Sequence, residues 1–393
     1  MRYDFDTLPP RRGTPNLKWN AYDADVLPMF VADMDFVSPQ LVIDALREQV
    51  DSGLFGYPNL ILHGDGIDLP TFRDVIVDRM ARRYQWLIQP QDIVFIPGVV
   101  VGTNIAVYAL CAPGEAMLVQ PPLYPPMLMA AAATQRGRVD APLVQQSDGS
   151  YAIDWGGFES AITADTRMFL FCNPHNPTGR VFRRNELERM AEICLRHDLL
   201  IASDEIHSDL LFGGQRHIPT ASLSPAIADR TVTLIAPSKT FNLPGLQCSI
   251  AIIQNPDLRQ KFNTARHGLV PWVNLMGLIA GEAAYHHGHE WLDQVLVYLE
   301  DNRDFLHDFV QRDLPSIQMA KPEGTYLAWL DCRKAGIEGS PYQFFLDKAR
   351  VALGDGTIFG PGGEGFVRLN FASPRSMLVD ALERMKTALS QFA

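Results

Sequence analysis

A lysine follows a short apolar run in the stretch "LIAPSKTFNLPG", which covers Leu234 to Gly245. The five residues Val232–Ala236 predict a buried strand, and Lys239 comes three positions after its end. An amine in this place must either reach water or be held by groups that use it. Burial near other cations lowers the pKa of a lysine enough to make it a nucleophile and a base. Lys239 is therefore the first candidate for chemistry.

Polar residues follow two further predicted strands in the same way. The run Arg167–Cys172 leads into "NPHNPTGR", and Leu199–Ser203 leads into "DEIH". Because ligands bind beyond the carboxyl ends of the strands in an open parallel sheet, we expect these side chains to meet at one edge. The side chains placed there are Asn173 and Asn176 after the first strand, Asp204 and His207 after the second, and Ser238 and Lys239 after the third.

An anion site is predicted at the same edge. The strand Ile93–Ile96 runs into "PGVVVGTNIAV", a glycine-containing turn that opens a helix. The free N–H groups and the positive dipole end of a helix N-terminus attract a phosphate. Pyridoxal phosphate needs an amine that binds it covalently, a carboxylate that keeps its pyridinium nitrogen protonated, and a phosphate site. The residues at this edge therefore favour a pyridoxal-phosphate enzyme.

The elements that position these residues divide the chain into three parts. Between about residues 46 and 280, short apolar strands alternate with amphipathic segments, which predicts a large α/β domain whose mainly parallel sheet is covered on both faces. We expect residues 281–393 to form a smaller α+β domain, joined by an irregular arm of residues 1–45. The strands expected in the large domain are Ile93–Ile96, Ala116–Gln120, Arg167–Cys172, Leu199–Ser203, Val232–Ala236 and Cys248–Ile253, with a helix at 185–198. The smaller domain is expected to hold strands at 325–331 and 365–371 and helices at 289–312, at 341–352 and from Pro374.

Composition excludes several classes of protein. The 393 residues are 47% hydrophobic and 20% charged, as in an ordinary soluble protein, and the net charge of −11 comes without any cluster of Lys and Arg. This argues against nucleic acid as a partner.

Five scattered cysteines without a CxxC pair are typical of reduced thiols in the cytoplasm. We see no secretory signal and no apolar run that could span a bilayer, so we expect a cytoplasmic protein without a membrane partner. The histidines of "YHHGHE" do not share one helix face, so no metal is expected.

Five segments of the sequence, in this order, carry a family resemblance: "LPMFVADMDF", "NPHNPTGRV", "SDEIHSDL", "APSKTFNLPGL" and "FVRLNFASPR". They resemble the fold type I aminotransferase-like enzymes, and within them the MalY/PatB group of cystathionine β-lyases, over about residues 18–375. The resemblance implies a large domain with a mainly parallel seven-stranded sheet and a smaller α+β C-terminal domain. It also implies pyridoxal phosphate as the cofactor and a homodimer with shared active sites.

The resemblance also assigns roles to single residues. Lys239 would be the lysine that carries the cofactor, and Asp204 would be the partner of the pyridinium nitrogen. Tyr124, in "QPPLYPPM", would stack on the ring. Arg368 would pair with the substrate carboxylate, for which a planar guanidinium is well suited. The remaining roles would fall to Asn176 and His207 at the ring hydroxyl, to Val99, Val100 and Ser238 at the phosphate, to Asn173 at the substrate, and to Tyr57 at the phosphate of the neighbouring subunit.

Each of these residues also has a simpler interpretation. A lysine after a strand is usually a solvated surface residue, and Asp204 could cap a helix or bind Mg²⁺, although no GxxxxGK[ST] supports a nucleotide site. Asn173 could only stabilise its turn, Tyr124 could pack in its loop, and Arg368 could form a structural ion pair. The amine, carboxylate and amide on adjacent strand ends favour the catalytic interpretation.

Two departures from the aminotransferase pattern bear on the reaction. Many aminotransferases of this fold have an arginine where this chain has Gln247, and His207 stands at the position of their ring-hydroxyl tyrosine. Both resemble the lyase group. We therefore expect carbon–sulfur β-elimination on L-cystathionine or related L-cysteine conjugates. A class I/II aminotransferase would use the same residues, and a regulatory protein could retain the fold without turnover.

Overall fold

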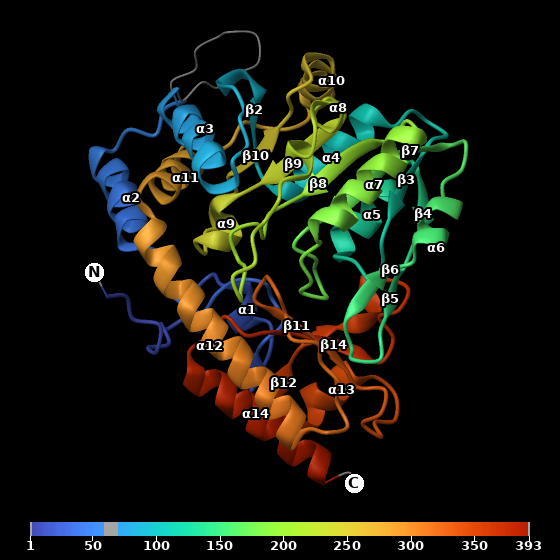
Figure 1. Cartoon of the computed structure of the whole chain (residues 1–393). Coiled ribbons are helices and arrows are strands. Elements are labelled where there is room, and N and C mark those ends of the chain that lie inside the picture. The colour runs from blue at the N-terminus through green and yellow to red at the C-terminus, as the bar shows by residue number, and fades with distance from the viewer. Residues whose placement is uncertain (1, 59–69, 392–393) are drawn as a thin grey trace.

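A seven-stranded sheet forms the centre of the computed structural model, which describes residues 2–58 and 70–391 (Figure 1). The strands lie in the order β2-β10-β9-β8-β7-β3-β4. β10 runs antiparallel to both of its neighbours, and the other pairs are parallel. The predicted mainly parallel seven-stranded sheet is thereby confirmed. Its strands are β2 (Ile93–Ile96), β3 (Ala116–Val119), β4 (Gly137–Asp140), β7 (Thr166–Cys172), β8 (Leu200–Asp204), β9 (Thr231–Ile235) and β10 (Ser249–Ile252).

The side chains of β7 show how the sheet is buried on both faces. Met168, Leu170 and Cys172 belong to an apolar cluster with residues of α4 and α5, whereas Phe169 and Phe171 belong to another with residues of α7. Alternate residues of a strand point to opposite faces, so an uninterrupted apolar run is what a doubly covered strand requires. The helices of this part are α2 (Gln40–Ser52), α3 (Pro70–Tyr84), α4 (Val99–Leu110), α5 (Pro125–Thr134), α6 (Trp155–Ser160), α7 (Arg184–Arg196), α8 (Pro225–Ala228), α9 (Pro237–Thr240), α10 (Pro256–Arg266) and α11 (Leu275–His287).

The C-terminal part is built around a three-stranded antiparallel sheet in the order β11-β14-β13. The 25-residue helix α12 runs from beside α2 and α11 down to the C-terminal part, and α14 lies beside its C-terminal half (Figure 1). The hairpin β5–β6 of the large part extends toward the same sheet. The elements are β5 (Leu143–Gln145), β6 (Tyr151–Ile153), α12 (His289–Asp313), β11 (Leu327–Asp331), α13 (Pro341–Phe344), β12 (Val351–Ala352), β13 (Gly354–Asp355), β14 (Phe366–Asn370) and α14 (Arg375–Ser390).

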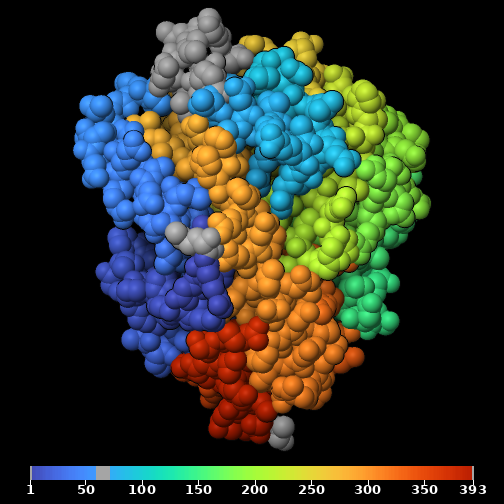
Figure 2. Space-filling view, turned by 60° about the vertical axis from the view of Figure 1, so that its left-hand side comes forward, coloured from blue at the N-terminus to red at the C-terminus, as the bar shows by residue number. Residues whose placement is uncertain are grey.

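The N-terminal residues lie against this C-terminal part, as the dark blue and red surfaces of Figure 2 show. β1 (Leu27–Pro28) pairs in parallel with β12, and Arg350 forms ion pairs with Asp23 and Asp25. The expectation that residues 1–45 are irregular is wrong in its details. A short helix α1 (Leu17–Asn20) lies within them, and α2 already begins at Gln40. The arm gains structure from tertiary pairing that its local sequence does not signal.

The predicted helix at 341–352 is also wrong in its second half. One α-helical turn, α13, passes into a π-helical turn at Phe345–Ala349. Arg350 then takes a left-handed conformation with φ of 54°, which ends the helix, and Val351 begins β12. Pairing with β1 overrides the helical pattern of this segment.

The predicted domain boundary at 281 falls inside α11, so a continuous helix crosses it, and the division into three parts remains a prediction. None of the described helices is both long and apolar enough to cross a membrane. Nor do the described residues contain a group of three or more His, Cys, Asp or Glu placed to hold a metal ion.

Candidate active site

A cavity of about 360 Å³ lies at the carboxyl ends of β2, β7, β8 and β9. These four strands and β3 run in the same direction, which brings residues from the ends of five strands to one edge. Of the residues predicted from the sequence, those that line the cavity are Val99, Val100, Tyr124, Asn176, Asp204, His207, Ser238 and Lys239. The structure thus brings together the amine, the carboxylate, the amide and the helix N-terminus.

Lys239 extends from α9, the single helical turn that follows β9. Its Nζ donates a hydrogen bond of 2.6 Å to the backbone carbonyl of Ala32. Burial, and then the nearby Arg368 guanidinium, lower its pKa to about 8, against the opposing effect of two carboxylates. A lysine with a lowered pKa has a substantial unprotonated fraction near neutral pH, as a nucleophile or base requires.

Asp204 is the last residue of β8 and is buried. Burial raises the pKa of its carboxyl group to about 7, although Oδ1 accepts a hydrogen bond of 3.1 Å from the Ile206 N–H. A buried carboxylate is costly to ionise unless a cation lies beside it. This carboxyl group is therefore suited to a ligand that brings a positive charge into the cavity.

Arg368 connects the smaller sheet to the cavity. It lies on β14, and its Nη1 donates 3.0 Å to Oδ1 of Asn176, while Nη2 donates 2.9 Å to the carbonyl of Phe30. Burial lowers its pKa to about 10. Its buried Nε has no hydrogen-bond partner among the described residues.

His207 and Tyr124 flank the same cavity. Burial, and then the positive charges of Lys239 and Arg368, hold the pKa of His207 well below its usual range, so the imidazole is neutral. Within the described part of the chain its Nδ1 has no partner. Tyr124 precedes α5, and its backbone N–H donates 3.1 Å to the carbonyl of Asn176. This bond fixes the tyrosine at the cavity wall.

The N-terminus of α4 forms the opposite end of the cavity. Gly98 precedes the helix with φ of 120°, a conformation that favours glycine, and the Gly102 N–H returns to its carbonyl. The N–H groups of the first turn, which include those of Val99 and Val100, have no partner within the helix. The Ser238 hydroxyl lines the same cavity. The residues fit pyridoxal phosphate, because each part of that molecule would lie beside a complementary group. The helix N–H groups suit its phosphate, the Asp204 carboxylate suits its cationic ring, and the Lys239 amine suits its carbonyl carbon.

Three predicted site residues lie outside the cavity wall: Arg368, which is joined to it through Asn176, and also Asn173 and Tyr57. Asn173 is fully buried, and its Oδ1 accepts a hydrogen bond of 3.2 Å from the Phe182 N–H, so it stabilises the loop after β7. Tyr57 is 84% exposed and contacts Trp272 edge-on, beside a separate wide hollow. Neither Asn173 nor Tyr57 meets Lys239 within this chain, and their functional roles remain predictions.

Sequence reasoning missed three residues around Lys239. Ala32 lies in "LPMFVADMDF", which carried the family resemblance, but no residue of that segment was assigned a role. Tyr326 donates its hydroxyl to the same Ala32 carbonyl at 2.9 Å, and it had been interpreted only as part of a strand. Asn242 follows Lys239 by three positions and bonds to the backbone of the arm. The asparagine in "SKTFN" was the available signal, because asparagine tolerates the left-handed φ of 58° found there.

Comparison with known proteins agrees with this geometry. Residues 25–385 match the sequence model of the family described as aminotransferase class I and II. The chain is 41% identical to cystathionine β-lyase PatB of Bacillus subtilis over 98% of this chain and 100% of that one. It is 33% identical to protein MalY of Escherichia coli over 96% of both chains. Among solved structures, the pyridoxal-phosphate-bound C–S lyase from Staphylococcus hominis superimposes with a TM-score of 0.91 at 34% identity over 99% of both chains.

Proposed function

The chain belongs to the aminotransferase class I and II family, and we propose that it is a pyridoxal-phosphate-dependent carbon–sulfur β-lyase. Its substrate would be L-cystathionine or a related L-cysteine conjugate, which with water gives a thiol, pyruvate and ammonia. The observation that supports this choice is the 41% identity with a cystathionine β-lyase along the whole chain. The pairing of a buried amine with a buried carboxylate across one cavity supports the cofactor.

When bound, pyridoxal phosphate supplies an electron sink that stabilises negative charge at the substrate Cα. In the proposed site the Lys239 amine would remove the Cα proton and then give a proton to the departing sulfur, so that it leaves as a thiol. The Asp204 carboxylate would keep a proton on the cofactor ring nitrogen. Because Asp204 is buried, its ionised form is favoured only when a cation such as the protonated ring lies beside it. Tyr124 would stack on the ring, Asn176 and His207 would serve the ring hydroxyl, and Val99, Val100 and Ser238 would hold the phosphate.

Arg368 would bind the substrate carboxylate. Its buried Nε has no partner among the described residues, and its two Nη atoms are already oriented by Asn176 and Phe30. A guanidinium fixed in this way loses little conformational freedom when an anion binds. Asn173 would act from behind the cavity through the loop that carries Asn176.

An aminotransferase is the alternative, because the same residues would serve a reaction in which the amino group passes to a 2-oxo acid and the thiol does not leave the substrate β-carbon. Gln247 lines the cavity at the position where many aminotransferases have an arginine, and this favours the lyase. A regulatory protein that retains the fold is the alternative without turnover.

The reaction is tested by incubating the cofactor-loaded enzyme with L-cystathionine in the absence of any 2-oxo acid. We expect pyruvate and free thiol to form in equal amounts over many turnovers. Turnover that depends on an added 2-oxo acid, with the amino group appearing on that acid, would identify an aminotransferase. A loaded protein that does neither would support the regulatory alternative.

We further propose a cytoplasmic homodimer with shared active sites. Large apolar side chains gather at one surface, where Phe55, Tyr57 and Trp272 line the hollow and remain 62%, 84% and 46% exposed. Exposed apolar patches of this kind are typical of interaction surfaces. Tyr57 would then reach the phosphate site of the partner subunit. The five buried free cysteines support a reducing compartment.

Shared sites predict that two inactive variants complement each other. A Lys239→Ala chain paired with a Tyr57→Ala chain forms one intact site per mixed dimer, since one subunit supplies the lysine and the other the tyrosine. An equal mixture should recover about a quarter of wild-type activity. The measurement is pyruvate formation after co-refolding, with each variant alone as the control. No recovery in dimers verified as mixed would contradict shared sites, provided that Tyr57→Ala alone is impaired.

A further inference from the structure

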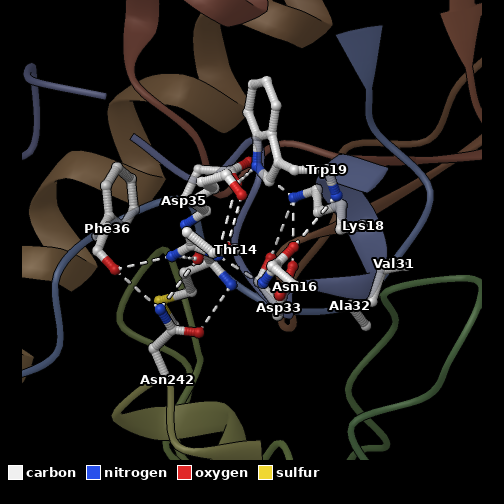
Figure 3. A network of polar contacts seen from close by, with 12 residues as sticks. Thr14, Asn16, Lys18, Trp19, Val31, Ala32, Asp33, Asp35, Phe36 and Asn242 are labelled. Atoms are coloured by element: carbon white, nitrogen blue, oxygen red, sulfur yellow. Dashed lines mark hydrogen bonds and ion pairs between the residues drawn. The ribbon is translucent and has the colours of Figure 1, made fainter. Parts of the chain in front are cut away.

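The residues Phe30–Phe36, here called the arm segment, are held by Asn242, which follows Lys239 by three positions (Figure 3). Asn242 bonds to the segment through both atoms of its amide. Its Oδ1 accepts from the Met34 N–H at 2.9 Å, and its Nδ2 donates to the carbonyls of Met34 and Phe36 at 2.9 Å each. The residue therefore ties the turn that follows Lys239 to a stretch more than 200 positions away in the sequence.

The smaller sheet holds the arm segment from another side. Asn370 donates to the carbonyls of Val31 and Asp33 at 2.6 Å each, and the Asp35 N–H donates to the carbonyl of Ala372 at 2.8 Å. The segment thus spans the interval between the Lys239 loop and β14. Its backbone polar groups are bonded to both parts of the molecule.

Two cations and two carboxylates, of which Lys18 and Asp35 are buried and Arg11 and Asp33 are partly exposed, fix the same segment. Lys18 is 1% exposed and pairs with Asp35 at 2.7 Å, and Trp19 donates from Nε1 to the other oxygen of Asp35 at 2.7 Å. Lys18 also lies 3.4 Å from Asp33, and Arg11 lies 3.5 Å from that carboxylate. Buried ion pairs add little net stability but strongly disfavour arrangements that separate them. The network therefore defines one position for the arm segment.

The fixed position of the arm segment determines where the Ala32 carbonyl lies. Its carbonyl accepts from Lys239 Nζ at 2.6 Å and from the Tyr326 hydroxyl at 2.9 Å. Two donors on one acceptor restrict where the amine can lie, since a carbonyl oxygen has two lone pairs and both are used. The amine position is thus set by the arm segment as well as by α9.

We propose that the arm segment is a positioning element for the Lys239 amine, and that Asn242 is the positioning residue that ties it to the Lys239 loop. The inference rests on one part of the proposed function, namely that Lys239 transfers the Cα proton of the substrate. Whenever Lys239 is not joined to another group, the Ala32 carbonyl holds its amine in one orientation, and proton transfer at Cα depends on that orientation.

The test is Asn242→Gly, because glycine adopts the left-handed conformation and the substitution removes only the amide contacts. Loss of the Cα proton from L-alanine in D₂O is followed by NMR, since L-alanine has no leaving group and reports proton transfer in a lyase or an aminotransferase alike. We expect exchange to slow about ten- to hundredfold, while the binding of pyridoxal phosphate and L-alanine is unchanged. In the cofactor-free chain, backbone hydrogen exchange should accelerate at Met34 and Asp35, with the melting temperature nearly retained.

The matched control is Asn255→Gly, which removes three hydrogen bonds of similar length at α10, away from the arm. It should leave proton transfer at the wild-type rate. Unchanged L-alanine exchange in Asn242→Gly, or slowing equal to that of the control, overturns the inference, as does unchanged hydrogen exchange in the arm segment. If Asn242→Gly does not fold, Asn242→Asp keeps the acceptor for Met34 and should slow exchange in the same direction. A loaded wild-type enzyme that never exchanges the proton would instead refute the proposed role of Lys239.

Discussion

Replacing Lys239 with alanine is expected to lower the rate of thiol release from L-cystathionine by about 10⁴-fold. The substitution removes the group that binds the cofactor covalently and the base that takes the Cα proton. No other described amine lines the cavity, so no neighbouring residue is placed to replace it. The measurement is the rate of pyruvate formation under saturating substrate, together with the visible absorbance of the purified protein.

Two observations make this result specific to the site. Wild-type enzyme should be yellow, and borohydride should fix the cofactor to the peptide that contains Lys239, whereas the variant should show neither. Lys321→Ala is the matched control, since that lysine is 42% exposed and pairs with Asp304 on the surface. A Lys239→Ala enzyme that retains more than a few per cent of the activity would refute the assignment.

Asp204→Asn is expected to lower kcat by about 10³-fold, with a smaller change in cofactor affinity. The amide has nearly the shape of the carboxyl group, so packing is retained, but it cannot hold a proton on the ring nitrogen by charge. Burial already raises the pKa of Asp204 to about 7, and a cation beside it would favour the ionised form. The measurement is kcat for pyruvate release beside the dissociation constant of pyridoxal phosphate.

The conservative variant Asp204→Glu serves as the control because it restores the charge at a slightly different distance. It should recover part of the activity lost in Asp204→Asn. Equal activity of Asp204→Asn and wild type would show that ring protonation does not depend on this residue.

The central part of the site could be predicted from the sequence because local patterns place it. Buried strands are apolar runs, and the polar residues directly after them must lie at the carboxyl edge of a parallel sheet. Lys239, Asp204 and Asn176 follow this rule, and all three line one cavity. The number of strands was implied by resemblance alone, and their order was not predicted, because pairing depends on contacts across the whole chain.

The contacts of the arm could not be predicted in the same way. The hydrogen bond between Lys239 and Ala32 joins residues 207 positions apart, and nothing in either local pattern indicates the other. The buried Lys18 illustrates the difficulty, since lysine is almost always exposed and only its partners Asp33 and Asp35 explain its place. The helix predicted at 341–352 is wrong in its second half for a similar reason, because β12 forms only by pairing with the distant β1.

The acceptor that Ala32 offers to Lys239 belongs to the main chain, and Ala32 is one of the residues that line the cavity. The hydrogen bond therefore does not depend on which residue stands at position 32, because any residue with the same backbone conformation places its carbonyl oxygen at the same point. Evolution or an engineer can change the bulk at position 32, and so the size of substrate admitted, without losing the acceptor for the catalytic amine. Substituting other side chains at position 32 would therefore change substrate selectivity but would not reveal the role of the backbone carbonyl.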